Sequence, residues 1–343
     1  MNKAESLMRQ EVREIPTAVA RLLDRGGAAI RAAADEARAR DPAFIATVAR
    51  GSSDHACTYL KYVSELSLGL AVASIGPSVA SIYRAPLKLD RALCISVSQS
   101  GRSPDIVEMA RAAREGGALT VAVTNDTASP LAEASDLILG LEAGPELSVA
   151  ATKTFVTSAV AGLALVAEWK GDAALLRAVA DLPGHLEAAV TADWGALAEL
   201  LTNARSLYTL GRGPAFAMSG EAALKFKETC QIHAENYSSA EVLHGPVSIV
   251  GQDFPVLAFA SADAAEDAVV EVADAMAGKG AAVFVTSAKP KSAAALPAVR
   301  TGHPLTDPIT LIVSFYAMVE QVARARGADP DRPRHLRKVT ETV

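Results

Sequence analysis

The sequence has few of the features that mark secreted, zinc-binding or nucleic-acid-binding proteins. Among its 343 residues are three cysteines, Cys57, Cys94 and Cys230, too few and too scattered for a disulfide framework or a zinc cage. We expect them to be buried thiols in a reducing compartment. Asp and Glu (39) outnumber Lys and Arg (33), and no basic run occurs, which argues against nucleic acid as a partner.

Long apolar segments are also missing. The longest apolar stretch lies between Lys153 and Glu168 and contains 14 residues, whereas a transmembrane helix needs about 20. The first sixteen residues are charged and lack the apolar core of a signal peptide. We therefore expect a cytoplasmic protein with no membrane partner.

Hydrophobic residues are plentiful, at 50% of the chain, so a chain of this length can bury a large core and is expected to form two domains. Short continuous apolar runs alternate with Ala-rich helical stretches. This alternation is typical of parallel strands that are buried on both faces by crossover helices.

Two halves of the chain read alike. Arg50 and Arg212 each end a short β-prone run in Arg-Gly, with a helical pattern after it, and they are 162 residues apart. Two further strand patterns recur at the same spacing, which indicates a duplication. These patterns are 94–97 with 256–259, and 121–124 with 283–286.

The predicted fold is therefore α/β, with two tandem flavodoxin-like subdomains, each a doubly wound parallel sheet. We expect an N-terminal helical segment at 1–40, with Val12, Ile15, Val19, Leu22 and Leu23 at helical spacing. Residues 171–201 should form a polar-faced helix that is broken at Pro183-Gly184. The subdomains are predicted at 41–180 and 181–326, and 327–343 is expected to be an extended arm.

Function in such folds sits where strands end. After the predicted strand 93–97 comes Ser-Gln-Ser-Gly-Arg-Ser-Pro-Asp at 98–105, leading into a helix. Hydroxyls, free N–H groups and a helix N-terminus make a phosphate site, but an ordinary N-cap loop fits the spacing equally well. The matching loop at 260–263 has lost most of these groups and gained an acid, so we expect one phosphate site per chain. Ser52 and Ser53 are candidates for the same cleft or for an N-cap.

In the second half, Glu221, Lys225 and Glu228 fall on one helix face at i, i+4 and i+7. By itself this spacing favours a solvated, salt-bridged face. His233 and His244 follow in a turn-rich stretch, but no third ligand has convincing metal spacing, so no metal is expected.

Together these motifs resemble the SIS (sugar isomerase) family, and specifically the isomerase half of glutamine–fructose-6-phosphate aminotransferases. The matching segments span nearly the whole chain and occur in order, at 8–16, 50–53, 98–101, 149–155, 210–213, 221–228, 232–237, 241–246 and 331–338. The resemblance implies two tandem SIS subdomains, the first binding phosphate and the second carrying catalytic groups.

For substrate binding, the resemblance implies a loop that holds a sugar 6-phosphate and backbone groups that contact the sugar hydroxyls. The loop residues would be Ser98, Gln99, Ser100 and Ser103, with Ser52 and Ser53 facing the same sugar, and the backbone contacts would come from near Val149 and Ala151.

For catalysis, the resemblance makes Glu228 the base that moves a proton between C1 and C2, with Lys225 beside the developing negative charge. His244 would assist ring opening from the partner subunit of a homodimer, with the active site at the subunit interface. Lys338 would be a Schiff-base lysine. No metal or organic cofactor is implied.

The sequence departs from the aminotransferases at several points. Arg50 stands where they have cysteine, Ala151 where they have serine, and the ending after Lys338 differs. Met1 lies almost directly before the isomerase-like part, so the expected reaction lacks a glutaminase step.

The resemblance to stand-alone isomerase-type deaminases implies conversion of glucosamine 6-phosphate to fructose 6-phosphate and ammonia. A ketose/aldose isomerase, a fructosamine-phosphate deglycase and an ammonia-dependent aminotransferase are close alternatives. A non-catalytic sugar-phosphate sensor is a further one, which retention of Glu228, His244 and Lys338 counts against. A nucleotide-binding fold is disfavoured, because no glycine-rich phosphate motif follows a strand.

Overall fold

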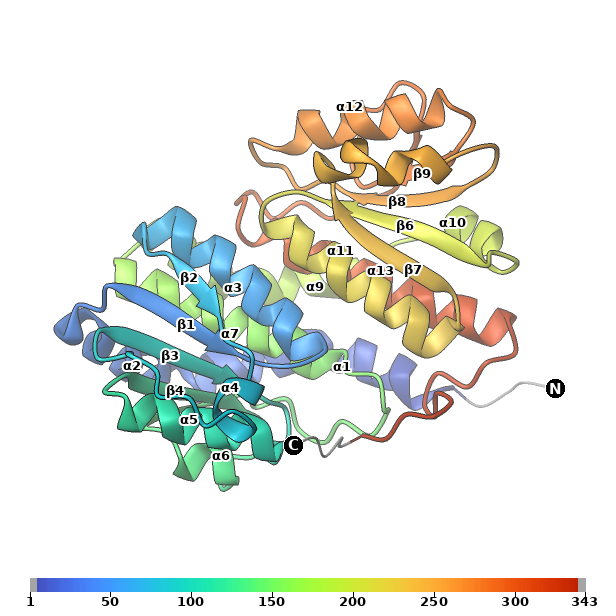
Figure 1. The fold of residues 1–343 in the computed structure, drawn as a ribbon. Helices are drawn as coiled ribbons and strands as arrows, with labels where there is room; N and C mark the ends of the chain where they lie inside the picture. The colour runs from blue at the N-terminus through green and yellow to red at the C-terminus, as the bar shows by residue number, and fades with distance from the viewer. Residues whose placement is uncertain (1–4, 339–343) are drawn as a thin grey trace. The chain divides into compact units, whose positions relative to one another are not determined.

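The computed structural model describes residues 5–338, which form two compact units (Figure 1). The first unit contains Thr17–Glu146, Lys153–Ala180 and, from residue 337 on, the described end of the arm. The second contains residues 5–16, Leu147–Thr152 and Asp181–Leu336. Each unit is built around one parallel sheet and is described by itself below.

Both sheets have five parallel strands in the same order. In the first unit the order is β2-β1-β3-β4-β5, and in the second it is β10-β9-β8-β6-β7, which is the same arrangement read from the other edge. This is the flavodoxin-like order 2-1-3-4-5, so the predicted fold class is confirmed. The strands are β1 (Phe44–Val48), β2 (Val72–Ser74), β3 (Ala92–Val97), β4 (Leu119–Thr124), β5 (Leu137–Gly140), β6 (Ser206–Gly211), β7 (His233–Ser238), β8 (Pro255–Phe259), β9 (Ala282–Val285) and β10 (Ala294–Ala295).

The strand register preserves the spacing seen in the sequence. Adding 162 to both residue numbers of a β1–β2 or β1–β3 pair gives the corresponding β6–β7 or β6–β8 pair. For the β3–β4 pairs and the corresponding β8–β9 pairs, the register differs by one residue. The preserved pairs are Ile45↔Val72 with Leu207↔Ala234 and Ala46↔Cys94 with Tyr208↔Val256, and the differing ones are Leu93↔Leu119 with Pro255↔Ala282.

Helices cover both faces of the first sheet. α2 (Gly27–Arg40) and α3 (Ser52–Leu68) pack against α7 (Lys153–Lys170), while α4 (Ser78–Ser81), α5 (Pro104–Glu115) and α6 (Pro130–Glu133) pack together. Every residue of β3 and β4 is buried, as continuous apolar strands should be. α8 (Ala173–Ala180) follows α7.

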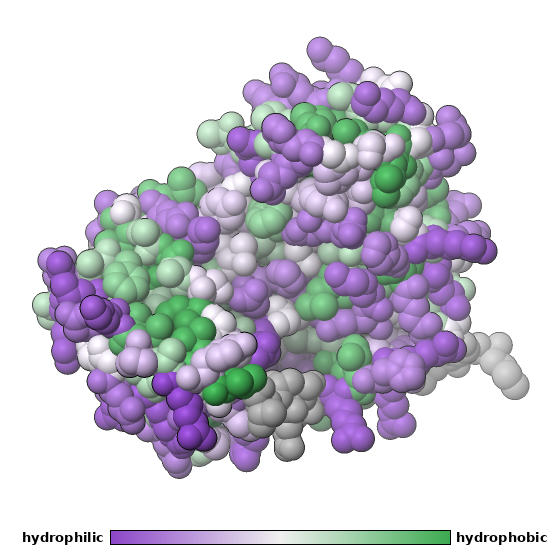
Figure 2. All heavy atoms as spheres, viewed as in Figure 1, coloured by the Kyte–Doolittle hydropathy of each residue, from purple (hydrophilic) through white to green (hydrophobic). Residues whose placement is uncertain are grey.

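The long apolar stretch of the sequence is the middle of α7, where all residues from Lys153 to Ala167 are buried. It is thus a core helix. Within residues 5–338 no helix is long and apolar enough to span a membrane. On the face drawn in Figure 2, hydrophobic side chains are interspersed with hydrophilic ones.

The second sheet has α12 (Glu266–Ala277) on the face that contains the buried cluster of Val256, Val269 and Met276. α11 (Pro214–Lys225) packs against β6 and against α13 (Asp307–Ala325). The remaining helices of this unit are α9 (Leu182–Ala189), α10 (Gly195–Leu201), the π-helix η1 (Phe226–Cys230) and the 3₁₀ turns η2 (Glu241–His244) and η3 (Pro246–Ile249).

The break predicted at Pro183-Gly184 is wrong. The helix ends at Ala180, and both residues lie in the first turn of α9, whose N-cap is Asp181. Proline is favoured in a first turn because its missing N–H would be unpaired there anyway.

The ends of the chain agree with the sequence analysis where they are described. Val12, Ile15, Val19 and Leu22 are fully buried on α1 (Leu7–Arg25), whose residues divide between the units. Residues 327–338 contain no helix or strand, as expected for an arm, and residues 339–343 of the predicted arm lie outside the described residues.

Candidate phosphate pocket and proton-transfer cluster

The loop after β3 is shaped by one glycine. Gly101 has φ +62°, and a Cβ atom there would lie 2.1 Å from the Oγ of Ser129. Only glycine fits both the conformation and the space. The loop then enters α5 at Pro104, the first helical residue.

The polar groups of this loop remain accessible to a ligand. The Oγ of Ser98 accepts the N–H of Gly101 at 3.2 Å, and the side chain of Ser103, the N-cap of α5, makes no capping hydrogen bond. The N–H groups of Gln99 and Ser100 donate no hydrogen bond to any other residue within 5–338. The alternative of a simple N-cap loop is therefore not supported by Ser103.

These groups line a cavity of about 310 Å³ in the first unit. It brings together five of the six predicted loop and cleft residues with the predicted lysine of the arm. They are Ser53, Ser98, Gln99, Ser100, Ser103 and Lys338. Ser52, the first residue of α3, is not among the lining residues.

Sequence reasoning noted Arg50 as a departure but assigned it no role. Arg50 lines the same cavity, and its guanidinium contacts Oδ2 of Asp105 at 2.7 Å through Nε and 2.5 Å through Nη2. The only sequence signal for this pair is that Arg50 and Asp105 each follow a strand of one sheet. Lys338, from the arm, contacts Oε2 of Glu146 at 2.8 Å.

In the second unit, a buried lysine lies between two glutamates. The Nζ of Lys225 is 2.5 Å from Oε2 of Glu228 and 3.2 Å from Oε1 of Glu221, and Tyr316 donates its hydroxyl to that same Oε1 at 2.9 Å. The side chains of Lys225 and Glu221 are fully buried, and that of Glu228 is 21% exposed. The solvated helix face suggested by spacing alone is therefore wrong.

The helix changes its winding within this cluster. α11 ends at Lys225 and continues as the π-helix that carries Glu228, so the i, i+3 pair is not on a regular α-helical face. Such π-turns are rare and are frequently found at functional sites.

Burial raises the pKa of the Glu221 carboxyl to about 7, although the charge of Lys225 acts in the opposite direction. Its Oε2 is buried and accepts no hydrogen bond from the described residues. Burial disfavours the charged form of Lys225, but Glu221 and Glu228 outweigh it and raise the lysine pKa. Lys225 is therefore held as a cation beside Glu228.

Glu228 does not lie where function was expected. The π-helix ends at Cys230 and β7 begins at His233, so Glu228 is near the amino end of a strand. His244 follows the carboxyl end of β7 and is exposed. β7 has six residues and spans about 20 Å, so His244 and Glu228 lie at opposite ends of this strand and are not brought together within one copy of the second unit.

The remaining predicted contacts, Val149 and Ala151, belong to the second unit, as Glu228 does. The N–H of Val149 donates to the carbonyl of Asp331 at 3.2 Å. Neither residue lines the cavity of the first unit.

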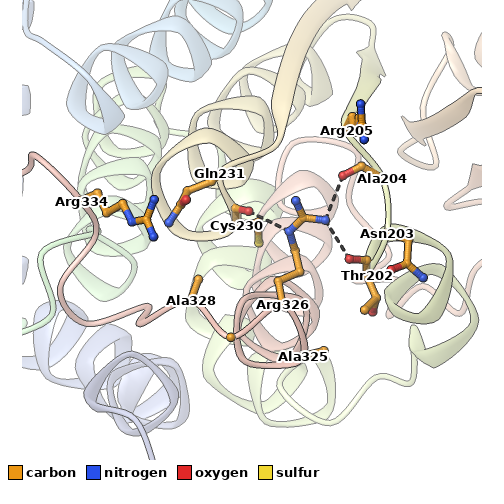
Figure 3. Close-up of a pocket in the computed structure, with 11 residues that line it drawn as sticks. Thr202, Asn203, Ala204, Arg205, Cys230, Gln231, Ala325, Arg326, Ala328 and Arg334 are labelled. Carbon is orange, nitrogen blue, oxygen red and sulfur yellow. Dashed lines mark hydrogen bonds between the residues drawn. The ribbon is translucent and has the colours of Figure 1, made fainter.

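Another cavity, of about 530 Å³, lies at the amino ends of β6 and β7 (Figure 3). Its centre is Arg326, whose guanidinium donates to the carbonyls of Leu201, Thr202, Ala204 and Cys230. These carbonyl groups lie at, or just after, the carboxyl ends of α10 and η1. We infer that Arg326 stabilises the end of the π-helix. No predicted site residue lines this cavity.

The model of the SIS domain matches residues 40–168 and 200–326. The chain belongs to the SIS family. The two matched segments contain β1–β5 and β6–β10, so each SIS domain carries one five-stranded sheet.

The relatives of this SIS chain are sugar-phosphate proteins. It is 36% identical over 315 residues to glutamine–fructose-6-phosphate aminotransferase [isomerizing] from Aeropyrum pernix, which covers 86% of this chain and 50% of that protein. The chain thus spans about half the length of this relative.

Two solved structures are similar over almost the whole chain. A candidate phosphosugar isomerase from Silicibacter pomeroyi is 61% identical, with a TM-score of 0.93, covering 95% of this chain and 100% of that one. The C-terminal domain of glucosamine-fructose-6-phosphate aminotransferase from Francisella tularensis is 25% identical, with a TM-score of 0.82, covering 97% and 99%.

Proposed function

We propose that this SIS protein is an enzyme that converts glucosamine 6-phosphate and water to fructose 6-phosphate and ammonia. The observation that carries the proposal is the Glu221–Lys225–Glu228 cluster, in which a carboxylate with partial solvent access touches a buried cation. The similarity of the chain to glutamine–fructose-6-phosphate aminotransferase supports amino-sugar chemistry.

The proposed reaction begins with ring opening, which gives an aldehyde at C1 beside the amine at C2. Glu228 removes the proton from C2, and the electrons move into a C1–C2 enolamine whose oxygen charge Lys225 stabilises. Glu228 then returns the proton to C1, and one proton passes from the nitrogen at C2 to the oxygen at C1, which leaves a hydroxyl at C1 and an imine at C2. Water adds to the imine, and ammonia leaves as fructose 6-phosphate forms.

The candidate residues would have two kinds of role. The loop at Ser98, Gln99, Ser100 and Ser103 would hold the 6-phosphate, and Glu228 and Lys225 would move the proton. Ser52 and Ser53 and the backbone near Val149 and Ala151 would contact the sugar.

His244 would assist ring opening in a homodimer. Its own Glu228 lies at the other end of β7, so a partner subunit is the natural source of the imidazole. The neighbouring Leu243 and Ile249 are 49% and 62% exposed, as expected of residues that are covered by another subunit. We also propose a cytoplasmic location, with which three free, buried cysteines agree.

Lys338 would not need to form a Schiff base in this direction, because water attacks the imine directly. In the structure its Nζ contacts Oε2 of Glu146 at 2.8 Å.

The test is ammonia release from glucosamine 6-phosphate by the purified protein, with fructose 6-phosphate measured in parallel. Equal amounts of both products support the proposal. Glucosamine 6-phosphate formed from fructose 6-phosphate and ammonia, without the reverse flux at physiological concentrations, would indicate an aminotransferase. Turnover only of ketose or aldose phosphates, or of fructosamine phosphates, would indicate an isomerase or a deglycase, and binding without any turnover would indicate a sensor.

A further inference from the structure

The cavity of the first unit contains two cations that the serine loop does not require. Arg50 follows β1, and Lys338 comes from the arm almost three hundred residues later, yet both line the cavity with Ser98, Ser100 and Ser103. No carboxylate lines it among the described residues. Hydroxyl and N–H groups alone would bind neutral and charged ligands, so two cations point to a more selective site.

Each cation is held from behind by a carboxylate that is fully buried. Asp105 receives two contacts from the guanidinium of Arg50 through Oδ2, while its Oδ1 accepts the N–H of Ile106 at 2.9 Å. The side chain of Asp105 is 0% exposed, and that of Arg50 is 47% exposed. Asp105 is thus fixed to the start of α5, and Arg50 extends from it into the cavity.

Glu146 holds Lys338 in the same manner. Its carboxylate accepts the N–H of Thr154 at 3.0 Å and the hydroxyl of Thr154 at 2.7 Å, and it contacts Lys338 at 2.8 Å. The side chain of Glu146 is 0% exposed, and that of Lys338 is 24% exposed. Burial opposes ionisation of Glu146, but the charge and hydrogen bonds of Lys338, with those of Thr154, lower its pKa.

The buried carboxylates reduce the repulsion between the two cations of the cavity. Without them, the positive charges of Arg50 and Lys338 would repel each other, whereas each carboxylate offsets the charge of the cation that it contacts. A guanidinium has five N–H groups and an ammonium has three, so each of these groups can contact an anion in addition to the carboxylate that holds it. Phosphate dianions match such donors well.

We propose that Arg50 and Lys338 bind the phosphate dianion of the substrate, and that Asp105 and Glu146 are positioning residues that fix the two cations. The inference rests on the proposed function in one respect, that the ligand is a sugar 6-phosphate. It assigns Lys338 to phosphate binding, and it gives Arg50 a role in selecting a dianion over neutral sugars.

The binding test uses sorbitol 6-phosphate, which carries the phosphate and hydroxyls but has no carbonyl and cannot turn over. Affinity is measured by titration calorimetry for wild type, Arg50→Gln, Lys338→Gln and Glu146→Gln. We expect each loss of a cation to weaken binding about 10- to 100-fold, because hydrogen bonds to charged groups are stronger than neutral ones. Sorbitol without phosphate should bind weakly and equally to all variants.

The matched control is Arg102→Gln. Arg102 lies in the same loop and is paired with Asp126 at 2.9 Å, but both side chains are exposed and neither lines the cavity. This variant, and Asp126→Asn, should bind sorbitol 6-phosphate as wild type does. Arg50→Lys should recover part of the affinity, since it restores the charge but not the planar donor group.

Turnover distinguishes positioning from general damage. With glucosamine 6-phosphate, Glu146→Gln should raise KM about tenfold and leave kcat within about threefold. Arg50 and Lys338 are partly exposed, so their variants test the idea even if the buried Glu146→Gln protein does not fold. Wild-type affinity for sorbitol 6-phosphate in both Arg50→Gln and Lys338→Gln would overturn it.

The outcomes also separate this inference from the proposed function. Ammonia release by wild type, together with unchanged binding of sorbitol 6-phosphate in the variants, would reject the two-cation site and support the deaminase. Loss of sorbitol 6-phosphate binding in the variants of a protein that releases no ammonia would support the two-cation site and reject the deaminase.

Discussion

The loop after β3 in the first sheet and the loop after β8 in the second sheet have the same place in the fold but different surroundings. In the first unit, the loop after β3 surrounds a cavity of about 310 Å³. In the second unit, the loop after β8 is occupied by the carboxylate of Asp307, which accepts the N–H groups of Ala262 at 2.9 Å and Thr301 at 3.2 Å. Arg300 contacts this carboxylate at 2.5 Å.

The comparison shows that equivalent strand ends can present backbone donors either to a carboxylate of the protein or to an open cavity. The second unit supplies its own anion, because α13 begins with Asp307, and Arg300 balances that charge while it also contacts Glu266 at 3.3 Å. No carboxylate within residues 5–338 lines the cavity of the first unit, and its two cations are held by carboxylates outside the lining. This difference is the reason for proposing one phosphate site per chain.

The largest effect is expected from removing the base of the second unit. Glu228→Gln keeps the shape of the side chain but cannot accept a proton, so ammonia release should fall about 10³-fold. Binding of sorbitol 6-phosphate should be unchanged, since the first unit is intact. Glu271→Gln, an exposed glutamate of α12, is the control for loss of one charge and should retain full turnover. Full activity in Glu228→Gln would exclude the proposed proton transfer.

Next in size is removal of the internal anion of the second unit. Asp307→Ala leaves Arg300 and the N–H groups of Ala262 and Thr301 without their acceptor, and should reduce the free energy of unfolding by about 3 kcal/mol. Chemical denaturation measures this change. Asp267→Asn, at a carboxylate that is 78% exposed and paired with Lys289, should cost less than about 1 kcal/mol. Equal losses in the two variants would contradict the role of Asp307.

The first loop can also be made to resemble the second. Ser103→Asp places a carboxylate at the N-cap of α5, beside the cavity, where Asp is a good cap residue. The protein should fold, yet affinity for sorbitol 6-phosphate should fall about 30-fold, because an internal anion competes with the phosphate. Titration calorimetry measures this change, with Ser103→Asn as the neutral control. Undiminished affinity would mean that the phosphate lies elsewhere.

A smaller, pH-dependent effect is expected at Glu221. Burial raises the pKa of this carboxyl to about 7, so between about pH 4.5 and 7 the folded protein keeps a proton that the unfolded chain releases. Glu221 therefore contributes stability at low pH that is lost as the pH rises through this interval.

Urea unfolding of wild type and Glu221→Gln over pH 4.5–7.5 measures this linkage. The difference in unfolding free energy, wild type minus variant, should fall by about 3 kcal/mol as the pH rises. A constant difference would show that Glu221 is ionised throughout.

Much of the fold could be predicted because its signals are local and repeated. Continuous apolar runs marked the buried strands, and the spacing of 162 residues between the copies reappears in the pairing Ala46↔Cys94 and Tyr208↔Val256. The helix break near Pro183 was placed wrongly because a proline breaks a helix interior but is favoured in a first turn.

The candidate site was less predictable. The serine loop could be found, since hydroxyls, a glycine and a helix start lie together in the sequence, and the structure groups them around one cavity. The spacing of Glu221, Lys225 and Glu228 suggested a solvated face, because burial depends on Tyr316 and the other residues of α13, which are almost a hundred residues away.

The sequence by itself determined the duplicated α/β architecture and the residue types at each strand end, because periodicity and spacing are properties of neighbouring residues. Only the tertiary structure decided which of these groups carry charge into a cavity. Arg50 meets Asp105 and Lys338 meets Glu146 through the packing of elements that are separate in the chain. Electrostatic effects depend on distance and burial, and both quantities are set by that packing.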